Sequence, residues 1–275
     1  AASSRPPASP DGALSPDDLP HAEYRRRARL IEIVGRDADD FSAHELSAGR
    51  QRQVILAEMD AIGVGSLTII ILTGFFTGGV LTVQTFPTLK SYGAQSQTGY
   101  LVAVSLVREL GPVLCALMVT GRVGSAISAE LGSMVVSQQI DAMRALGTDP
   151  TRKLVGPRLV ALLVSLPLLT VVADVVGIGG GGVVATGLYG LTMDQYLSSV
   201  REGITTDDII GGVIKPLCFG IIIASIACYK GLSTDGGTVG VGRATTRAVV
   251  LASIVVIIAD FFLSRGLQYL LGMPV

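Results

Sequence analysis

Five apolar runs, each about long enough to cross a bilayer, dominate this sequence and limit what it can fold into. A helix needs about 20 residues to cross the hydrocarbon core, and we expect spans at 61–83, 98–121, 158–186, 209–229 and 246–265. The chain is 49% hydrophobic and 16% charged, whereas a soluble domain is about 25% charged. The sequence therefore predicts an all-α polytopic membrane protein.

Charged residues beside the spans predict the orientation of the chain. If the amino terminus is cytoplasmic, ten basic residues flank the spans inside and three outside, a positive-inside bias. The inner set is Arg50, Arg52, Arg122, Arg144, Arg152, Lys153, Arg158, Lys230, Arg243 and Arg247, and the outer set is Lys90, Arg201 and Arg265. The carboxyl terminus is then extracytoplasmic, and 190–208 forms an external loop with a short helix from Thr192 to Gly203.

The residues before the first span have a different character. Residues 1–23 are rich in Pro, Ala, Ser and Asp and lack apolar periodicity, which predicts a disordered tail. Residues 24–60 are charged and weakly amphipathic. A helix lying at the cytoplasmic membrane surface accounts for them, and a solvated helix accounts for them almost as well.

The cytoplasmic link between the second and third spans carries an apolar stripe at helical spacing, which predicts a helix over about 134–147. Gly147 is placed to end this helix, and Asp149 with Pro150 to begin the next. The helix either lies against the membrane or its own bundle, or it is a coupling helix in a groove of a nucleotide-binding partner. On the second interpretation the ATPase-coupling residues are Val136, Ile140, Asp141, Met143, Arg144 and Leu146.

Several long motifs in this region resemble one known family. They are RELGPV from Arg108, GRVGSAISAELGSM from Gly121, QQIDAMRALGTDP from Gln138, CYKGL from Cys228 and GVGRATTRAVV from Gly240. In this order they are similar to the MlaE/YrbE permeases, the membrane subunits of ABC transporters that move phospholipids or other lipids with MCE-domain partners. The resemblance covers about residues 60–270.

The resemblance implies a set of partners. We expect a homodimer, a cytoplasmic ABC ATPase pair docked on the coupling helix, and an extracytoplasmic MCE assembly that exchanges lipid with a pocket at the dimer interface. In that family the first span helps to line the pocket, which assigns the lining here to Leu72, Phe75, Phe76 and Val80. The expected location is a bacterial inner membrane, with a chloroplast inner envelope as the alternative.

Ionisable residues inside the spans point to a possible lipid pathway. Arg108, Glu109, Asp174, Lys215 and Asp260 each cost about 2.5 to 3.5 kcal/mol on insertion scales, so they should face a bundle interior or a wet cavity. Adjacent helical residues point about 100° apart, so Arg108 and Glu109 should pair with other helices.

We hypothesise that Glu109, Lys215 and Asp260 form a polar cluster under an outward-opening lipid cavity. Arg108 either joins this cluster or contacts a phosphate, and Lys215 is a candidate headgroup contact. The alternative is a charge network between helices that only holds the dimer together.

The remaining motifs indicate no catalytic or metal site. Gly236 to Gly242 lacks the lysine of a phosphate-binding loop, and we expect it, like Gly177 to Gly182, to be a flexible segment. The three cysteines lie in apolar runs, and the only histidines are His21 and His44. ATP and Mg²⁺ are therefore expected in a partner ATPase and no cofactor in this chain. A net charge of −1 gives no reason to expect nucleic acid.

The sequence thus favours the permease subunit of a lipid ABC transporter without an ATPase site of its own. Two other classes remain open. The chain could be a non-transporting scaffold for an MCE assembly, or a secondary transporter driven by protons through Glu109 and Asp260.

Overall fold

A computed structural model of the chain describes residues 48–271, and every regular element within them is a helix. In chain order these are α2 (Ala48–Ser91), η2 (Gln95–Gln97), α3 (Thr98–Ser105), η3 (Leu106–Leu110), α4 (Gly111–Val119), η4 (Thr120–Gly124), α5 (Ser125–Val136), α6 (Gln139–Ala145), η5 (Thr151–Val155), α7 (Gly156–Tyr189), α8 (Met193–Gly203), α9 (Thr206–Leu232) and α10 (Gly237–Leu271). The predicted tail and residues 24–47 of the predicted interfacial segment lie outside the described residues. Residues 48–60 of that segment belong to α2.

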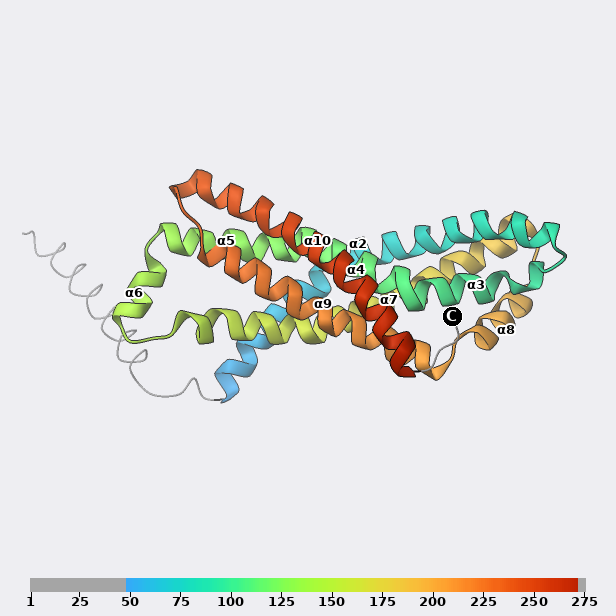
Figure 1. The fold of residues 1–275 in the computed structure, drawn as a ribbon, viewed down its shortest axis with the longest axis horizontal. Coiled ribbons are helices and arrows are strands. Elements are labelled where there is room, and N and C mark those ends of the chain that lie inside the picture. The colour runs from blue at the N-terminus through green and yellow to red at the C-terminus, as the bar shows by residue number, and fades with distance from the viewer. Residues whose placement is uncertain (1–47, 272–275) are drawn as a thin grey trace, which may run out of the picture. The chain divides into compact units, whose positions relative to one another are not determined.

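Five stretches of the described chain are long and apolar enough to cross a membrane, which confirms the all-α polytopic prediction. They are Arg52–Ser91, Gln95–Val136, Thr151–Tyr189, Thr206–Leu232 and Gly237–Tyr269. Each contains one predicted span and extends beyond it. Within the unit formed by 49–275, these helices run alongside one another, as Figure 1 shows.

The chain alternates between two ends of this bundle (Figure 1). At one end α6 follows α5, and the link between α9 and α10 lies beside α5, since Thr234 packs against Gly132. At the other end α8 packs on α3 through its buried residue Tyr196. We call these the coupling end and the α8 end.

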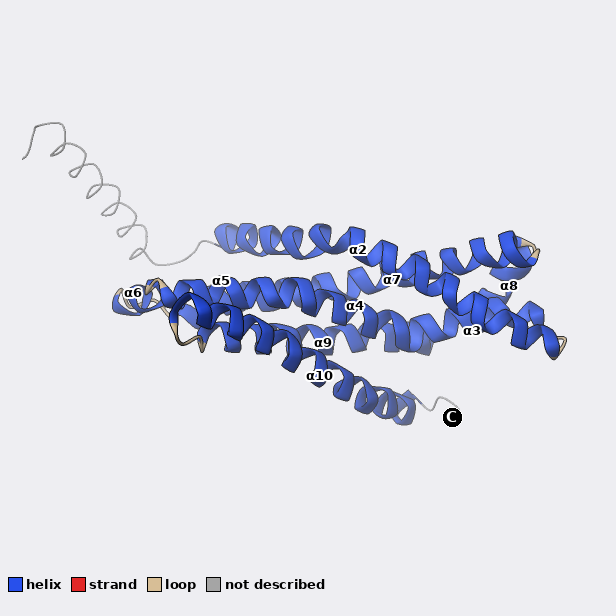
Figure 2. Cartoon of the chain, turned by 90° about the horizontal axis from the view of Figure 1, so that it is seen from above, coloured by secondary structure: helices blue, strands red, loops and turns tan. Residues whose placement is uncertain are grey.

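The core centres on α9, which packs against α5, α7 and α10. Phe219 and Ile223 of α9 and Leu162 and Leu166 of α7 have no exposed surface. The flanking helices α2 and α10 are much less covered: only 17% of the most apolar window of each is buried, against 44% for α9. Figure 2 shows them on opposite flanks of the bundle. Each therefore offers a long apolar face to lipid or to another protein.

Glycines bring α2 and α7 into backbone contact. A Cβ added at Gly78 would lie 1.8 Å from the carbonyl oxygen of Gly177, and one at Gly180 would lie 2.3 Å from that of Phe75. The prediction of a flexible segment over Gly177 to Gly182 is wrong, because these residues are helical and closely packed within α7. Small residues let the two helices approach.

The second glycine-rich segment also differs from its prediction. Helix α10 begins at Gly237, so the turn after α9 covers only Ser233 to Gly236. Gly236 and Gly237 have φ values of 87° and 68°, a region that glycine enters without steric cost. The tight turn ends there, and the remaining glycines of the predicted loop join the helix.

Helix α8 confirms the short helix predicted in the loop between the third and fourth spans. Its first turn is closed by a capping box in which Thr192 and Gln195 satisfy each other's backbone N–H groups. Tyr196, 1% exposed, donates its hydroxyl proton to the carbonyl oxygen of Ile178 at 3.0 Å. Burial raises the pKa of Tyr196 above its usual value, so this phenol stays a donor.

Candidate functional site

A buried lysine links three helices between the middle of the bundle and the α8 end. The Lys215 Nζ atom of α9 donates to Glu109 Oε2 at 2.8 Å and to the carbonyl oxygen of Arg108 at 2.6 Å. It also lies 3.4 Å from Asp260 Oδ1 of α10. Ser264 donates to the same Glu109 oxygen at 3.1 Å. The structure thus brings Glu109, Lys215 and Asp260 together, and we call these three residues the outer cluster.

The outer cluster is unequally exposed. The side chain of Lys215 is 3% exposed, whereas that of Glu109 is 45% exposed. Because three oxygens surround the ammonium, Lys215 contacts protein groups in this structure, and its role as a headgroup contact stays a prediction. A small pocket borders the cluster, lined by Arg108, Glu109, Asp207, Asp208, Gly211, Lys215, Ser264, Leu267 and Gln268. Within this pocket Glu109 is the accessible member of the cluster.

Arg108 pairs away from the outer cluster. Its Nε donates to Asp208 Oδ1, and the second oxygen of Asp208 accepts from the backbone N–H of Thr205 at 2.9 Å. This confirms that Arg108 and Glu109 have partners on other helices. The arginine side chain is 33% exposed, so part of its guanidinium faces the pocket.

Asp208 was missed because it falls at the end of the predicted external loop. The signal was present in the sequence, since Thr205 and Asp208 stand before an apolar run with the spacing of a capping box. The structure forms that box at the first turn of α9. Asp208 therefore has two functions: it caps α9 and pairs with Arg108.

Basic residues occur in each π-helical segment of the described chain. Arg108 lies in η3, Arg122 in η4, and Arg152 with Lys153 in η5. Such segments interrupt the regular α-helical register and are frequent at functional sites. In η3 the interruption presents Arg108 and Glu109 to different parts of α9. Arg122 instead points toward α2, where its Nη1 donates to Ser66 Oγ at 2.9 Å.

A shallow, wide-open surface lies along the exposed face of α2, and we call it the groove; all the residues that line it belong to α2. It measures about 400 Å³ and is lined by Leu72, Thr73, Phe76, Thr77 and Val80. Leu72, Phe76 and Val80 are each more than half exposed. The fourth predicted lining residue, Phe75, is not among them, because it is partly buried and its backbone touches Gly180. Three of the four predicted residues thus share one groove.

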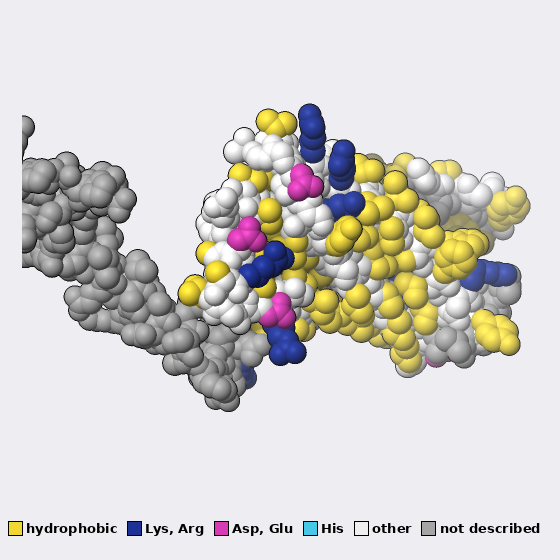
Figure 3. Space-filling view, turned by 60° about the vertical axis from the view of Figure 1, so that its left-hand side comes forward, with side chains coloured by type: hydrophobic (Ala, Val, Ile, Leu, Met, Phe, Trp, Pro, Cys, Tyr) yellow, Lys and Arg dark blue, Asp and Glu magenta, His cyan; other side chains and the backbone are white. Residues whose placement is uncertain are grey.

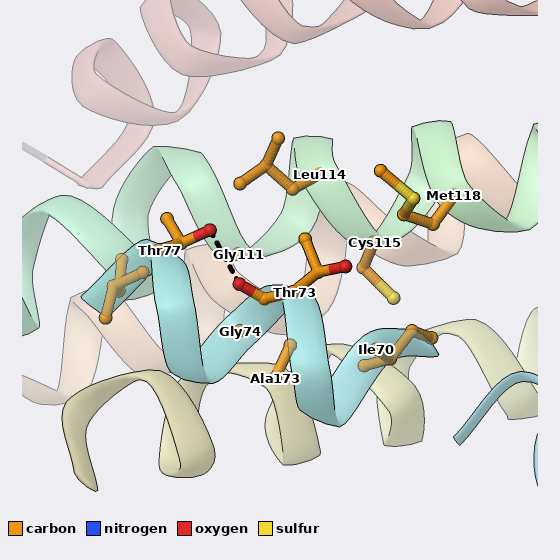
Figure 4. A pocket seen from close by; sticks show the side chains of 10 residues that line it. Ile70, Thr73, Gly74, Thr77, Gly111, Leu114, Cys115, Met118 and Ala173 are labelled. Carbon is orange, nitrogen blue, oxygen red and sulfur yellow. Dashed lines mark hydrogen bonds between the residues drawn. The ribbon is translucent and has the colours of Figure 1, made fainter. Parts of the chain in front are cut away.

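A second cavity lies between α2, α4 and α7 and shares Thr73 and Thr77 with the groove. Figure 4 shows Gly111, Leu114, Cys115 and Met118 opposite these threonines. The Thr77 hydroxyl donates to the carbonyl oxygen of Thr73 at 2.7 Å. Because the helix satisfies that hydroxyl, this wall of the cavity is largely apolar. The cavity measures about 20 Å³, which is room for little more than one water-sized group.

Asp174 lies apart from the outer cluster. It is 8% exposed on α7, and a Cβ at Gly111 would lie 1.8 Å from its Oδ1. That oxygen has no hydrogen-bond partner among the described residues. Gly111 therefore makes the room that Asp174 occupies. The outer cluster thus gathers three of the five predicted intramembrane ionisable residues, and Arg108 adjoins it.

The segment predicted as one coupling helix is divided. Helix α5 ends at Val136, Gln138 has a φ of 60°, and α6 begins at Gln139. The predicted stripe is also divided: Ile140 is 3% exposed and packs inward, whereas Leu146 is 62% exposed. Asp141 and Arg144 are exposed and lie 3.3 Å apart, and Met143 is half-buried.

The carboxyl-terminal end of α6 and the start of the next helix follow the sequence prediction. Gly147 has a φ of 75°, and its N–H donates to the carbonyl oxygen of Arg144. Asp149 Oδ1 accepts from the Thr151 N–H at 2.9 Å, which stabilises the next helical start. Figure 3 shows charged side chains gathered at the coupling end beside a surface of hydrophobic side chains.

Comparison with known proteins finds a family match over most of the residues that form the five spans. The family model of permease MlaE matches residues 55–265. The chain belongs to the MlaE permease family. A probable ABC transporter permease protein of Rickettsia bellii is 40% identical over 248 residues, covering 88% of this chain and 94% of that protein.

Two further relatives carry more specific names. The intermembrane phospholipid transport system permease protein MlaE of Haemophilus influenzae is 37% identical, covering 77% of this chain and 81% of that protein. The chloroplastic protein TRIGALACTOSYLDIACYLGLYCEROL 1 of Arabidopsis thaliana is 38% identical, covering 76% of this chain and 60% of that protein. MlaE permeases of this kind are thus membrane subunits of ABC transporters, and the motifs named above all lie within the matched residues.

Proposed function

We propose that this MlaE permease moves phospholipid or a related lipid between the membrane and an MCE-domain partner, driven by separate ATPase subunits. The observation that carries the proposal is the family match, which spans all five membrane helices and the segment between α5 and α7. In this proposal two copies of the chain assemble, and the barely covered faces of α2 and α10 supply lipid contacts and the dimer interface.

In this proposal lipid contacts two surfaces that share no lining residue, the groove of α2 and the pocket beside Arg108. Its acyl chains fit the groove of Leu72, Phe76 and Val80, which is apolar and open to the surface. Its phosphate fits the exposed part of the Arg108 guanidinium, because a planar fork of N–H donors matches phosphate oxygens. Lys215 contacts Glu109 and so offsets the negative charge that would otherwise lie beside that phosphate.

The ATPase pair would dock on α6 from the cytoplasm. Of the predicted coupling residues, Val136, Asp141, Arg144 and Leu146 are exposed, so they supply the contact in place of the full predicted stripe. This places the amino terminus and the coupling end in the cytoplasm and α8 outside, in a bacterial inner membrane. The basic residues at the coupling end support that orientation. ATP and Mg²⁺ belong to the partner in this scheme.

Reconstituted transfer tests the proposal. The chain, its ATPase subunits and its MCE partner are placed in nanodiscs with fluorescent phospholipid, and transfer to acceptor vesicles is followed with and without ATP. We expect transfer that requires ATP and stops when the ATPase carries an inactivated nucleotide site. Transfer driven by a proton gradient without ATP would favour the secondary transporter, and stable assembly without any transfer would favour the scaffold.

A further inference from the structure

A second buried cation lies at the coupling end. Arg158, in the first turn of α7, has a side chain that is 3% exposed. Its Nη2 lies 2.7 Å from Glu130 Oε1 of α5, and its Nε lies 3.3 Å from Glu58 Oε1 of α2. One guanidinium thus connects three helices, and we call Arg158, Glu58 and Glu130 the inner cluster.

The inner cluster joins the two helices that lead into and out of the coupling segment. Helix α5 leads into α6, and η5 with α7 leads out of it. The contact between Arg158 and Glu130 therefore closes the coupling segment at its base, so that α6 lies on a loop whose two arms are fixed to each other. A displacement of α6 relative to the bundle therefore acts on the contact between Arg158 and Glu130.

The third partner extends the connection to α2. Glu58 lies at the coupling end of the same continuous helix that carries the groove of Leu72, Phe76 and Val80. Because α2 is one of the least covered helices, each polar contact that it makes with the bundle matters for its position. Its contact with Arg158 acts on the end nearest to α6.

The inner cluster is also incompletely satisfied. Arg158 Nη1 is buried and has no hydrogen-bond partner among the described residues. Buried donors in native proteins are nearly always paired, so an orphan of this kind needs an explanation. A guanidinium with an unpaired N–H group can form a new bond to a carboxylate before an existing bond breaks. Such a contact can rearrange when the helices around it move.

We infer that Arg158 is a positioning residue that joins both arms of the coupling segment to α2 and so transmits displacement of α6 to the lipid groove. The inference rests on the proposed function, in which an ATPase displaces α6. Lysine is not equivalent to Arg158 here, because it lacks the planar set of N–H donors with which Arg158 contacts Glu58 and Glu130. The inference assigns Arg158 to the coupling of ATP use to lipid movement and gives it no contact with lipid.

The test measures ATP hydrolysis and lipid transfer in the same reconstituted complex for Arg158→Lys and Arg158→Gln. Rates are normalised to the amount of assembled complex. We expect both variants to keep hydrolysing ATP while the lipid moved per ATP falls about fivefold or more, the lower range for a coupling energy. The matched control is Arg152→Gln: this arginine of the same segment is 92% exposed, and its replacement should change the ratio by no more than about twofold.

Glu58→Gln provides a second arm in case the arginine variants assemble poorly. It keeps the size of the side chain, removes only the charge of a partner that is 28% exposed, and should lower the same ratio. Equal losses of hydrolysis and transfer in these variants, or an unchanged ratio, would overturn the inference. A wild-type complex that moves no lipid with ATP would instead overturn the proposed function itself.

Discussion

The two ends of the bundle use the same electrostatic arrangement with different cations. In the outer cluster Lys215 contacts carboxylates from η3 and α10, and in the inner cluster Arg158 contacts carboxylates from α2 and α5. Both cations are 3% exposed. Lys215 also donates to the backbone carbonyl oxygen of Arg108 and borders a pocket. Arg158 instead has one N–H group, Nη1, without a partner among the described residues.

In the proposed function and the inference drawn from it, this difference separates a binding role from a transmitting role. The outer cluster presents Glu109 and the neighbouring Arg108 to a pocket, so its charges are accessible to a ligand. The inner cluster presents Glu130 to solvent but hides its cation, so its main effect is on the positions of helices. If the comparison is sound, mutations in the two clusters will damage different steps.

The largest effect is expected when the outer cluster loses its cation. Lys215→Met leaves Glu109 and Asp260 beside each other in an apolar span. Removing one partner of a buried ion pair costs about 3 to 5 kcal/mol. We expect a large loss of thermal stability of the detergent-solubilised protein, measured by size-exclusion chromatography after heating.

The matched control removes the carboxylates as well. The triple variant Lys215→Met, Glu109→Gln, Asp260→Asn carries no charge in the outer cluster, and replacement of a whole buried ion pair is often neutral. We expect its stability to recover while lipid transfer stays lost. Recovery of both would mean that these charges only hold helices together.

At the coupling end we expect substitution of one apolar residue to lower stability and substitution of another to weaken binding of the ATPase. Ile140→Ala removes a buried side chain and should cost about 2 to 5 kcal/mol. Leu146→Ala removes an exposed side chain and should leave stability unchanged while weakening co-purification of the ATPase. Thermal stability and pull-down of the ATPase from the same preparations separate the two; a stable Ile140→Ala variant would contradict the assigned burial.

The close approach of α2 and α7 can be tested by adding a methyl group at a glycine of either helix. Gly78→Ala forces the carbonyl of Gly177 to move and should cost about 1 to 3 kcal/mol through overpacking. Gly179→Ala meets nothing within 4 Å and should be neutral or stabilising by up to about 1 kcal/mol. Equal melting temperatures for the two variants would rule out the close approach.

The smallest effect concerns α8, outside both clusters. Tyr196→Phe removes the hydroxyl that donates to Ile178 but keeps the ring in its site, so it should cost about 1 kcal/mol. Transfer normalised to assembled complex should be unchanged. A selective loss of transfer would show that α8 takes part in handling lipid, and the division of functions between the two clusters would need revision.

The sequence predicted those features that depend on local patterns. The five spans follow from runs of apolar residues, the turn at Gly147 follows from its glycine, and α8 matches the short helix expected from Thr192 to Gly203. The meeting of Glu109, Lys215 and Asp260 followed from the cost of charges in apolar helices. Each of these inferences needs only the neighbouring residues or the membrane as a solvent.

Features that depend on packing were missed or misjudged. Glycines in 177–182 indicated flexibility, yet their lack of side chains is what lets α7 pack against α2. Arg158 was counted only as an inner-side charge, because its partners Glu58 and Glu130 come from distant parts of the chain. The break at Gln138 and the π-helical segments at Leu106–Leu110, Thr120–Gly124 and Thr151–Val155 had no recognised sequence signal.

Photo-crosslinking in working membranes tests the central claim most directly, because it locates lipid and motor on opposite parts of one chain. A photoreactive phenylalanine replaces Phe76 in the groove or Leu146 beside α6, both more than 60% exposed. The account predicts that the probe at Phe76 captures phospholipid and the probe at Leu146 captures a nucleotide-binding subunit. Capture of an extracytoplasmic protein at Leu146, or no lipid at Phe76, would contradict it.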